Sequence, residues 1–136
     1  MGVIFDTSVL VTLERGSHGL EKLADGREDD PFGISVVTVS ELLHGVHRAD
    51  SEKRRLKRSA FVEKIIQTFP VYPFDLSAAR IYARVWANLA KKGTAVGAHD
   101  LMIASTAIAL GYSVVTVDLR DYGKIKEASV EKFIVE

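Results

Sequence analysis

Residues 2–14 of the chain are GVIFDTSVLVTLE. This stretch begins with a short apolar run, and the polar residues Asp6, Thr7 and Ser8 follow directly. Such residues favour the N-cap of a helix, and residues 9–14 continue with apolar side chains at helical spacing. The stretch therefore predicts a strand that turns directly into a helix.

The same order of strand and helix recurs along the chain. Residues 32–37 predict a second strand, which runs into a capping box at residues 38–41. Residues 98–110, rich in alanine, predict a helix that packs close to a sheet, and residues 113–117 predict a strand covered on both faces. Strands that alternate with helices predict an α/β fold of three layers, with a central, mostly parallel sheet flanked by helices.

Three more elements complete the expected fold. Residues 50–69 predict a helix that ends at Pro70. Residues 71–73 predict a short edge strand, because Pro73 cannot donate a hydrogen bond to a neighbouring strand. Residues 77–92 predict a helix with apolar residues spaced by four and lysines in its last turn.

The composition indicates a single folded domain over residues 1–136, since 47% of the residues are apolar and 26% are charged. The chain has 18 basic and 18 acidic residues, so any contact with nucleic acid requires a local patch. It has no cysteine, which excludes disulfides and thiolate chemistry. The longest nearly apolar stretch, residues 101–110, is too short to span a bilayer. With no recognisable leader at its start, we expect a soluble, cytoplasmic protein without a membrane partner.

Four acidic residues are expected at the same edge of the sheet. Asp6 and Asp118 each follow a predicted strand, and Glu41 lies in the first turn of the helix after the second strand. Asp100 begins the helix that leads back to the last predicted strand. Because ligands bind outside the carboxyl ends of parallel strands, we expect the four carboxylates to converge there.

Convergence of carboxylates is unfavourable by itself, since like charges raise one another's pKa values. A divalent cation relieves the repulsion, and oxygen ligands without cysteine favour Mg²⁺ or Mn²⁺ over zinc. Such an ion neutralises a phosphate and activates a water molecule. The acids therefore predict metal-dependent hydrolysis of a phosphodiester.

Each acid also has a purely structural interpretation. Asp6 could cap the first helix, Glu41 could complete its capping box, and Asp118 with Asp121 could cap a terminal turn. Asp100 would favour the dipole of its own helix. Taken singly, Glu41 and Asp121 favour the structural interpretation. Four independent caps need not point at one another, however, so the joint pattern favours a site.

Four segments resemble, in order, the successive motifs of the PIN domain: VIFDTSVL (3–10), SELLHG (40–45), DLMIASTA (100–107) and VTVDLRDY (115–122). More narrowly, the chain is similar to the VapC toxins of prokaryotic toxin–antitoxin pairs. The resemblance covers essentially the whole chain, and the combination of segments is specific although each segment alone is not.

The resemblance implies a metal-dependent endoribonuclease that acts on RNA, uses Mg²⁺ or Mn²⁺, forms a homodimer and pairs with a VapB-type antitoxin. It implies a catalytic metal site made of Asp6, Glu41, Asp100 and Asp118. Thr116 matches the family threonine that orients the last acid. Ser8 is expected to cap a helix and to add a hydrogen bond to a metal-bound carboxylate or water.

One motif departs from the family pattern. Many such toxins have Thr-x-Asn-x-x-Asp-Phe, whereas this chain has TVDLRDY at residues 116–122. An acid occupies both candidate positions, so Asp118 or Asp121 could complete a second metal site. We favour Asp118, because it lies nearer the end of the strand.

A basic run near the start of the helix predicted at residues 50–69 comprises Lys53, Arg54, Arg55, Lys57 and Arg58. Such a run is most often a solvated helix face, which is the interpretation that we favour. Contact with RNA phosphates is the alternative.

Two rival functions remain open. A haloacid-dehalogenase-like phosphatase would also have an aspartate after an apolar strand, but Ser8 stands where its second aspartate is expected. A PIN-like module that binds RNA or protein without catalysis is expected to lack one of the acids. None of the four is missing from this chain, which favours the enzyme.

Overall fold

A computed structural model describes residues 1–16 and 19–134 of the chain. Within them lie five strands, β1 (Val3–Phe5), β2 (Phe32–Ser35), β3 (Val71–Tyr72), β4 (Ser113–Thr116) and β5 (Ser129–Lys132). The same residues form α1 (Thr7–Arg15), α2 (Val36–His47), α3 (Glu52–Thr68), α4 (Leu76–Lys91) and α5 (Ala98–Leu110), and the short 3-10 helices η1 (Leu20–Ala24) and η2 (Tyr122–Lys124). No helix in these two ranges has the length and apolar character needed to cross a membrane.

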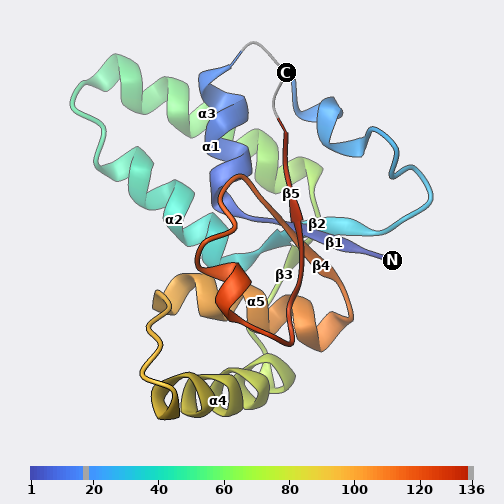
Figure 1. Cartoon of the computed structure of the whole chain (residues 1–136). Coiled ribbons are helices and arrows are strands. Elements are labelled where there is room, and N and C mark those ends of the chain that lie inside the picture. Colours follow the sequence, from blue (N-terminus) through green and yellow to red (C-terminus); the bar gives the residue numbers. More distant parts are fainter. Residues whose placement is uncertain (17–18, 135–136) are drawn as a thin grey trace.

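Strand β1 lies at the centre of a sheet whose order is β3-β2-β1-β4-β5, with every neighbouring pair parallel. Its side chains alternate between two layers of helices. Val3 and Phe5 are buried in an apolar cluster with residues of α1 and α3, and Ile4 is buried in a second cluster with residues of α4 and α5. Figure 1 shows these helix pairs on opposite sides of the sheet. The predicted three-layer α/β fold is confirmed.

The order of strands in the sheet reverses at β1, because β2 lies on one side of this strand and β4 on the other. At such a switch point, the loops that leave neighbouring strands diverge and open a crevice. Asp6 follows β1, α2 follows β2, and residues 117–121 follow β4. The segments that carry the predicted acids therefore meet at the carboxyl edge of the sheet.

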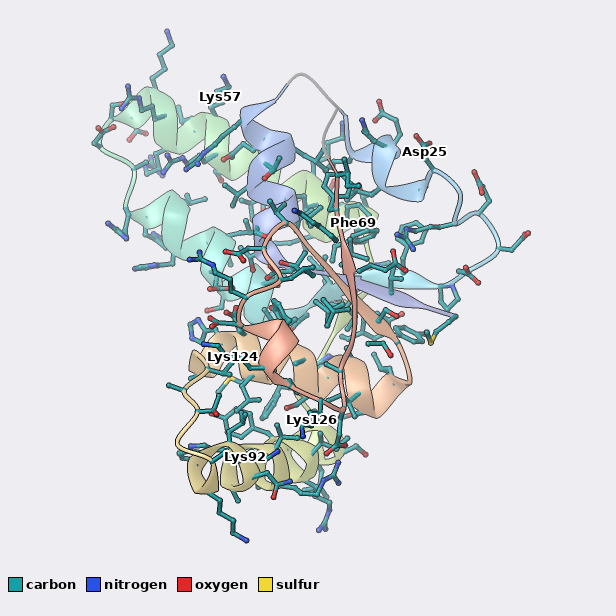
Figure 2. All side chains as sticks on the ribbon, in the orientation of Figure 1. Asp25, Lys57, Phe69, Lys92, Lys124 and Lys126 are labelled. Atoms are coloured by element: carbon teal, nitrogen blue, oxygen red, sulfur yellow. The ribbon has the colours of Figure 1, made fainter. Side chains whose placement is uncertain are left out.

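Three phenylalanines hold the end of α3 against the sheet. The rings of Phe5, Phe32 and Phe69 pack edge to face, with centroids 5.8 to 6.3 Å apart. Phe69 directly follows α3, is 5% exposed and is labelled in Figure 2. Edge-to-face pairs of this kind add stability beyond the burial of their area. The cluster thus fixes α3 against the two strands that precede the acidic edge.

Helix α2 begins earlier than the sequence predicts. The hydroxyl of Ser35 accepts a hydrogen bond from the backbone N–H of Val37 at 3.0 Å, so Ser35 is the N-cap. The expected capping box at residues 38–41 is therefore wrong, and the strand before it ends at Ser35. Glu41 lies in the second turn of α2, not in the first.

Strand β5 was not predicted. It pairs in parallel with β4 and forms one edge of the sheet. Its sequence, SVEK, has a single apolar residue, and its side chains are mostly exposed. An edge strand with no buried face gives no apolar pattern, so the sequence carries little signal for it.

We predict that Ile65 is essential to the packing of α3. Ile65 is completely buried, whereas Leu56 of the same helix is 58% exposed. Replacing Ile65 with alanine should lower the free energy of unfolding by about 2–5 kcal/mol, because it leaves a cavity. The matched control, Leu56→Ala, should change it by less than about 0.5 kcal/mol. Urea denaturation measures both, and equal losses would contradict this placement of α3.

Candidate active site

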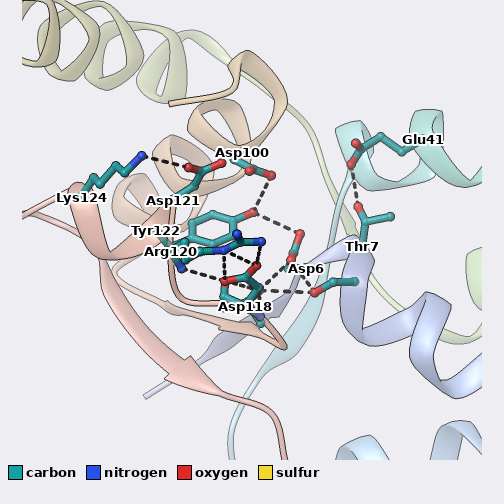
Figure 3. A pocket seen from close by; sticks show the side chains of 11 residues that line it. Asp6, Thr7, Glu41, Asp100, Asp118, Arg120, Asp121, Tyr122 and Lys124 are labelled. Atoms are coloured by element: carbon teal, nitrogen blue, oxygen red, sulfur yellow. Dashed lines mark hydrogen bonds and ion pairs between the residues drawn. The ribbon is translucent and has the colours of Figure 1, made fainter. Parts of the chain in front are cut away.

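A pocket of about 560 Å³ lies at the carboxyl edge of the sheet (Figure 3). The side chains come from four separate parts of the chain: α1 and the residue before it, α2, α5, and the end of β4 with the segment that follows it. The pocket is lined by all the acids and hydroxyls that the sequence assigned to the site, namely Asp6, Ser8, Glu41, Asp100, Thr116, Asp118 and Asp121.

Asp6 lies deepest among the acids, with 6% of its surface exposed. Its Oδ2 atom accepts hydrogen bonds from the hydroxyls of Ser8 at 2.7 Å and Thr116 at 2.8 Å. Its Oδ1 atom accepts one from the hydroxyl of Tyr122 at 3.1 Å. Asp6 precedes α1 as its N-cap residue but makes no side-chain cap. Its carboxylate is thus held by hydroxyl groups and not by the helix terminus.

Backbone groups fix the direction of two of these hydrogen bonds. The Ser8 hydroxyl accepts from the N–H of Val117 at 3.2 Å, and the Thr116 hydroxyl accepts from the N–H of Asp118 at 3.2 Å. Each hydroxyl can therefore donate its own hydrogen to Asp6. Ser8 was expected to cap a helix, but it lies inside α1, and its hydroxyl bonds Asp6 and Val117 and not an N–H of that helix. Thr116 was expected to orient the last acid, but its hydroxyl donates to Asp6 and meets Asp118 only through the backbone.

Tyr122 also contacts the acids of the site, although the sequence did not predict this. Its hydroxyl lies between two acids, 3.1 Å from Oδ1 of Asp6 and 3.4 Å from Oδ1 of Asp100 (Figure 3). Burial, followed by the negative charges of the two acids, raises the pKa of Tyr122 far above its usual value. The hydroxyl therefore stays protonated and acts as a donor. The sequence feature that could have pointed to this role is the tyrosine at position 122, where the family pattern has phenylalanine.

Asp100 lies in the first turn of α5 and is half-buried. Burial raises its pKa to about 6, and the negative charges of Asp6, Asp121 and Glu41 add to the effect. The repulsion among acids that the sequence predicts is therefore present. Asp100 is the residue on which it acts most clearly.

Glu41 approaches the pocket from α2. Its Oε1 atom accepts a hydrogen bond from the hydroxyl of Thr7 at 2.6 Å, and its Oε2 atom lies 3.4 Å from Nδ1 of His99. Its side chain is 31% exposed, so it can meet a ligand in the pocket. Thr7, the first residue of α1, therefore orients a second acid next to the one that Ser8 orients.

The two candidate acids after β4 have different partners. Asp118 accepts hydrogen bonds from Nε and Nη2 of Arg120 at 2.8 and 2.6 Å, and these bonds lower its pKa. Asp121 contributes to the raised pKa of Asp100, and its Oδ1 lies 3.4 Å from Nζ of Lys124. Asp118 thus pairs with an exposed arginine, whereas Asp121 lies beside the acids of the pocket.

The donor set suits a hard divalent cation with few protein ligands. Over the described ranges, no three histidine, aspartate or glutamate side chains are close enough together to hold one ion. Asp6 and Asp100 are the acids that share a hydroxyl, and Mg²⁺ in proteins is often held by only one or two carboxylates and several waters. Asp6 and Asp100 therefore fit such an ion by their chemistry.

The basic run at the start of α3 has several different partners. Arg54 pairs with Asp50, Arg55 pairs with Glu52, and Arg58 donates to the carbonyl of Gly45 at 3.1 Å.

A groove of about 280 Å³ is lined by Arg54, Lys57 and Arg58, together with the side chains of Glu14 and Phe61. A neighbouring groove of about 160 Å³ shares Arg58 and reaches Thr7 and Glu41, which also line the acidic pocket. One side of the basic run is thus continuous with the candidate site.

Comparisons with known proteins show the family to which the chain belongs. Ribonuclease VapC1 of Rickettsia felis is 36% identical over 133 residues, which cover 96% of this chain and 95% of that protein. The tRNA(fMet)-specific endonuclease VapC of Salmonella typhimurium is 38% identical over 98 residues, which cover 72% of each chain. VapBC-5 of Mycobacterium tuberculosis, a toxin–antitoxin system, matches with a TM-score of 0.75 at 32% identity over 98% of both chains. The PIN domain family model matches residues 3–127, and the chain belongs to this family.

Proposed function

We propose that this chain is an endoribonuclease that requires Mg²⁺ or Mn²⁺ and acts as the toxin of a toxin–antitoxin pair. One observation carries the metal-dependent chemistry: Asp6 and Asp100, from separate elements, meet at one hydroxyl in an acidic pocket. The ribonuclease and endonuclease activities named for two relatives that are more than 35% identical support RNA as the substrate.

The charge of the pocket supports the need for a cation. Within residues 1–16 and 19–134, no cationic side chain pairs with Asp6 or Asp100. A phosphate that approached these acids would be repelled, because all the groups carry negative charge. A divalent ion between acids and phosphate reverses this effect. The absence of cysteine from the chain agrees with a hard ion rather than zinc.

A bound Mg²⁺ or Mn²⁺ would neutralise the scissile phosphate and lower the pKa of the attacking water. Asp6 and Asp100 would hold it, with Ser8 and Thr116 keeping the Asp6 carboxylate in one orientation. Glu41, oriented by Thr7, would take a proton from the attacking water. The water oxygen would bond to phosphorus as the bond to the leaving oxygen breaks, and the leaving oxygen would take a proton from solvent.

Beside Asp6, Glu41 and Asp100, we propose Asp121 as the fourth acid of the site, in place of the Asp118 expected from the sequence. The effect of Asp121 on the pKa of Asp100 supports this choice. Asp118 accepts two hydrogen bonds from Arg120, at 2.8 and 2.6 Å, whereas Asp121 has one longer contact, at 3.4 Å, with Nζ of Lys124. Asp118 would therefore have to give up the stronger pairing before it could bind an ion, which also supports Asp121.

A VapB-type antitoxin is the proposed partner. The support is the likeness over nearly the full chain to VapBC-5, a member of a toxin–antitoxin family, at 32% identity. The homodimer implied by the family resemblance stays a prediction.

We expect RNA cleavage to require added Mg²⁺ or Mn²⁺ and to stop in excess EDTA. Asp100→Asn should abolish cleavage because it removes a charge that holds the ion, and Asp121→Asn should reduce cleavage more than Asp118→Asn. Gel analysis of a labelled RNA measures all of these. Full activity in EDTA, or wild-type turnover by Asp100→Asn, would refute the assigned chemistry.

Asp100→Asn should also stabilise the protein in EDTA at neutral pH. The pKa of Asp100 is raised from 3.8 to about 6. The folded state therefore carries no penalty from Asp100 below about pH 4, where the carboxyl is protonated, and it loses stability as the pH rises through about 6 and the carboxyl ionises. The shift corresponds to at most about 3 kcal/mol, which partial exposure to solvent reduces to about 1 kcal/mol.

Urea unfolding at pH 4 and pH 7.5 tests this expectation. The stability difference between Asp100→Asn and wild type should grow with pH. Asp25→Asn is the control, because Asp25 is exposed and lies far from the pocket (Figure 2). A difference that is the same at both pH values would contradict repulsion at Asp100.

We further propose that RNA phosphates contact the side of the basic run that lines the groove. Lys57 lines this groove and Lys53 does not, although both are exposed lysines of α3. Lys57→Ala should weaken binding to unrelated RNA sequences and flatten the slope of log affinity against log salt by about 0.7. Lys53→Ala should leave the slope unchanged. Identical slopes in both variants and wild type would show that the whole run is a solvated face.

A further inference from the structure

The geometry points to Tyr122 as a positioning residue, whose hydroxyl holds Asp6 and Asp100 together as a ready-made pair of ligands for the divalent ion. This role rests on the proposed function and adds a residue that the set of acids does not include. It concerns the affinity of the site for the ion and not the chemical step itself.

The contacts of the hydroxyl are specific to these two acids. It lies 3.1 Å from Oδ1 of Asp6 and 3.4 Å from Oδ1 of Asp100. Oδ2 of Asp6 already accepts two hydroxyl hydrogens, so the Oδ1 atom faces Tyr122 alone among the hydroxyls described. A hydroxyl has one hydrogen to donate, and the two acids share it.

The position of this hydroxyl is fixed by the core. Tyr122 is 2% exposed and belongs to the apolar cluster formed with residues of β1, β4, α4 and α5, including Ile4 and Leu101. Leu101 directly follows Asp100 in α5, so the same packing that holds the ring also holds the backbone of that acid. The ring is thus held rigidly between β1, which Asp6 directly follows, and α5, which carries Asp100.

The hydroxyl of Tyr122 adds nothing to the apolar packing of its ring. A buried hydroxyl is costly unless it is hydrogen-bonded, and this one bonds to the two acids. A phenylalanine ring would fill the same space without that cost. The tyrosine therefore gains its advantage from the acids, whose repulsion its hydrogen reduces. Each acid oxygen keeps a second lone pair for an ion.

The test compares Tyr122→Phe with Tyr82→Phe in the full-length protein. Tyr82 also packs against the cluster that contains Tyr122, lies on α4 and does not line the acidic pocket. Mn²⁺ affinity is measured from the EPR signal of free Mn²⁺, and Asp100→Asn identifies the site. Far-UV circular dichroism and urea unfolding in EDTA report the fold.

Tyr122→Phe should bind Mn²⁺ about tenfold more weakly, as is typical when a group that orients a metal ligand is removed. Tyr82→Phe should match wild type. RNA cleavage by Tyr122→Phe should need more Mn²⁺ and recover its wild-type kcat at saturating Mn²⁺.

Unchanged Mn²⁺ affinity in Tyr122→Phe, with or without lower stability in EDTA, would overturn the positioning role and leave the proposed function intact. A kcat that stays low at saturating Mn²⁺ would also overturn it. If wild type has no Mn²⁺ site that Asp100→Asn removes, the metal requirement of the proposed function fails, and the role of Tyr122 fails with it.

Discussion

A buried negative charge at the carboxyl end of the central strand is the constraint on which the site depends. Asp6 is 6% exposed, and an ionised carboxylate in such surroundings is costly unless donors surround it. Its donors belong to α1, β4 and η2, through Ser8, Thr116 and Tyr122. Its backbone N–H donates to the carbonyl of Val115 at 2.9 Å. The first strand and the last third of the chain must therefore fold together before this charge is accommodated.

The hydroxyl donors around Asp6 solvate its charge without cancelling it, because they are neutral. An arginine or lysine in their place would neutralise the carboxylate and weaken its attraction for a cation. The consequence appears at Asp100, where burial and the neighbouring acids raise the pKa to about 6. The fold thus tolerates repulsion at one edge of the sheet, and this repulsion is what a divalent ion can relieve. Perturbed pKa values concentrate at functional sites for this reason.

The edge of the sheet that holds the acids was predictable from the sequence, but several local details were not. The acids follow strands, and a parallel sheet brings strand ends together, so Asp6 and the segment after β4 could be placed without coordinates. The start of α2 could not, because Ser35 and Thr38 are both good N-cap residues and only tertiary packing selects between them. The earlier start of α2 does not change the face of the helix on which Glu41 lies, because a shift of three residues is close to one helical turn.

Side-chain partners were harder to predict than positions. Asp118 and Asp121 both stand where the motif allows an acid, and sequence spacing does not reveal that Arg120 turns back onto Asp118. Tyr122 was visible only as a change of one ring substituent from the family pattern, and its role depends on two residues that are more than 20 positions away. Contacts of this kind arise from the tertiary fold, which periodicity does not encode.

The charges of the chain are balanced in number but unevenly distributed over its surface. The 18 basic and 18 acidic residues cancel, yet acids outnumber cations in the lining of the pocket, whereas cations outnumber the single acid, Glu14, in the groove that Lys57 and Arg58 line. Asp50 and Glu52 pair with Arg54 and Arg55 at the start of α3, which limits the strongest positive field to the later part of the run. Exposed charges act over only about 8 Å at physiological salt. An RNA phosphate therefore responds to the cations next to the pocket, and a net charge of zero is no obstacle to its binding.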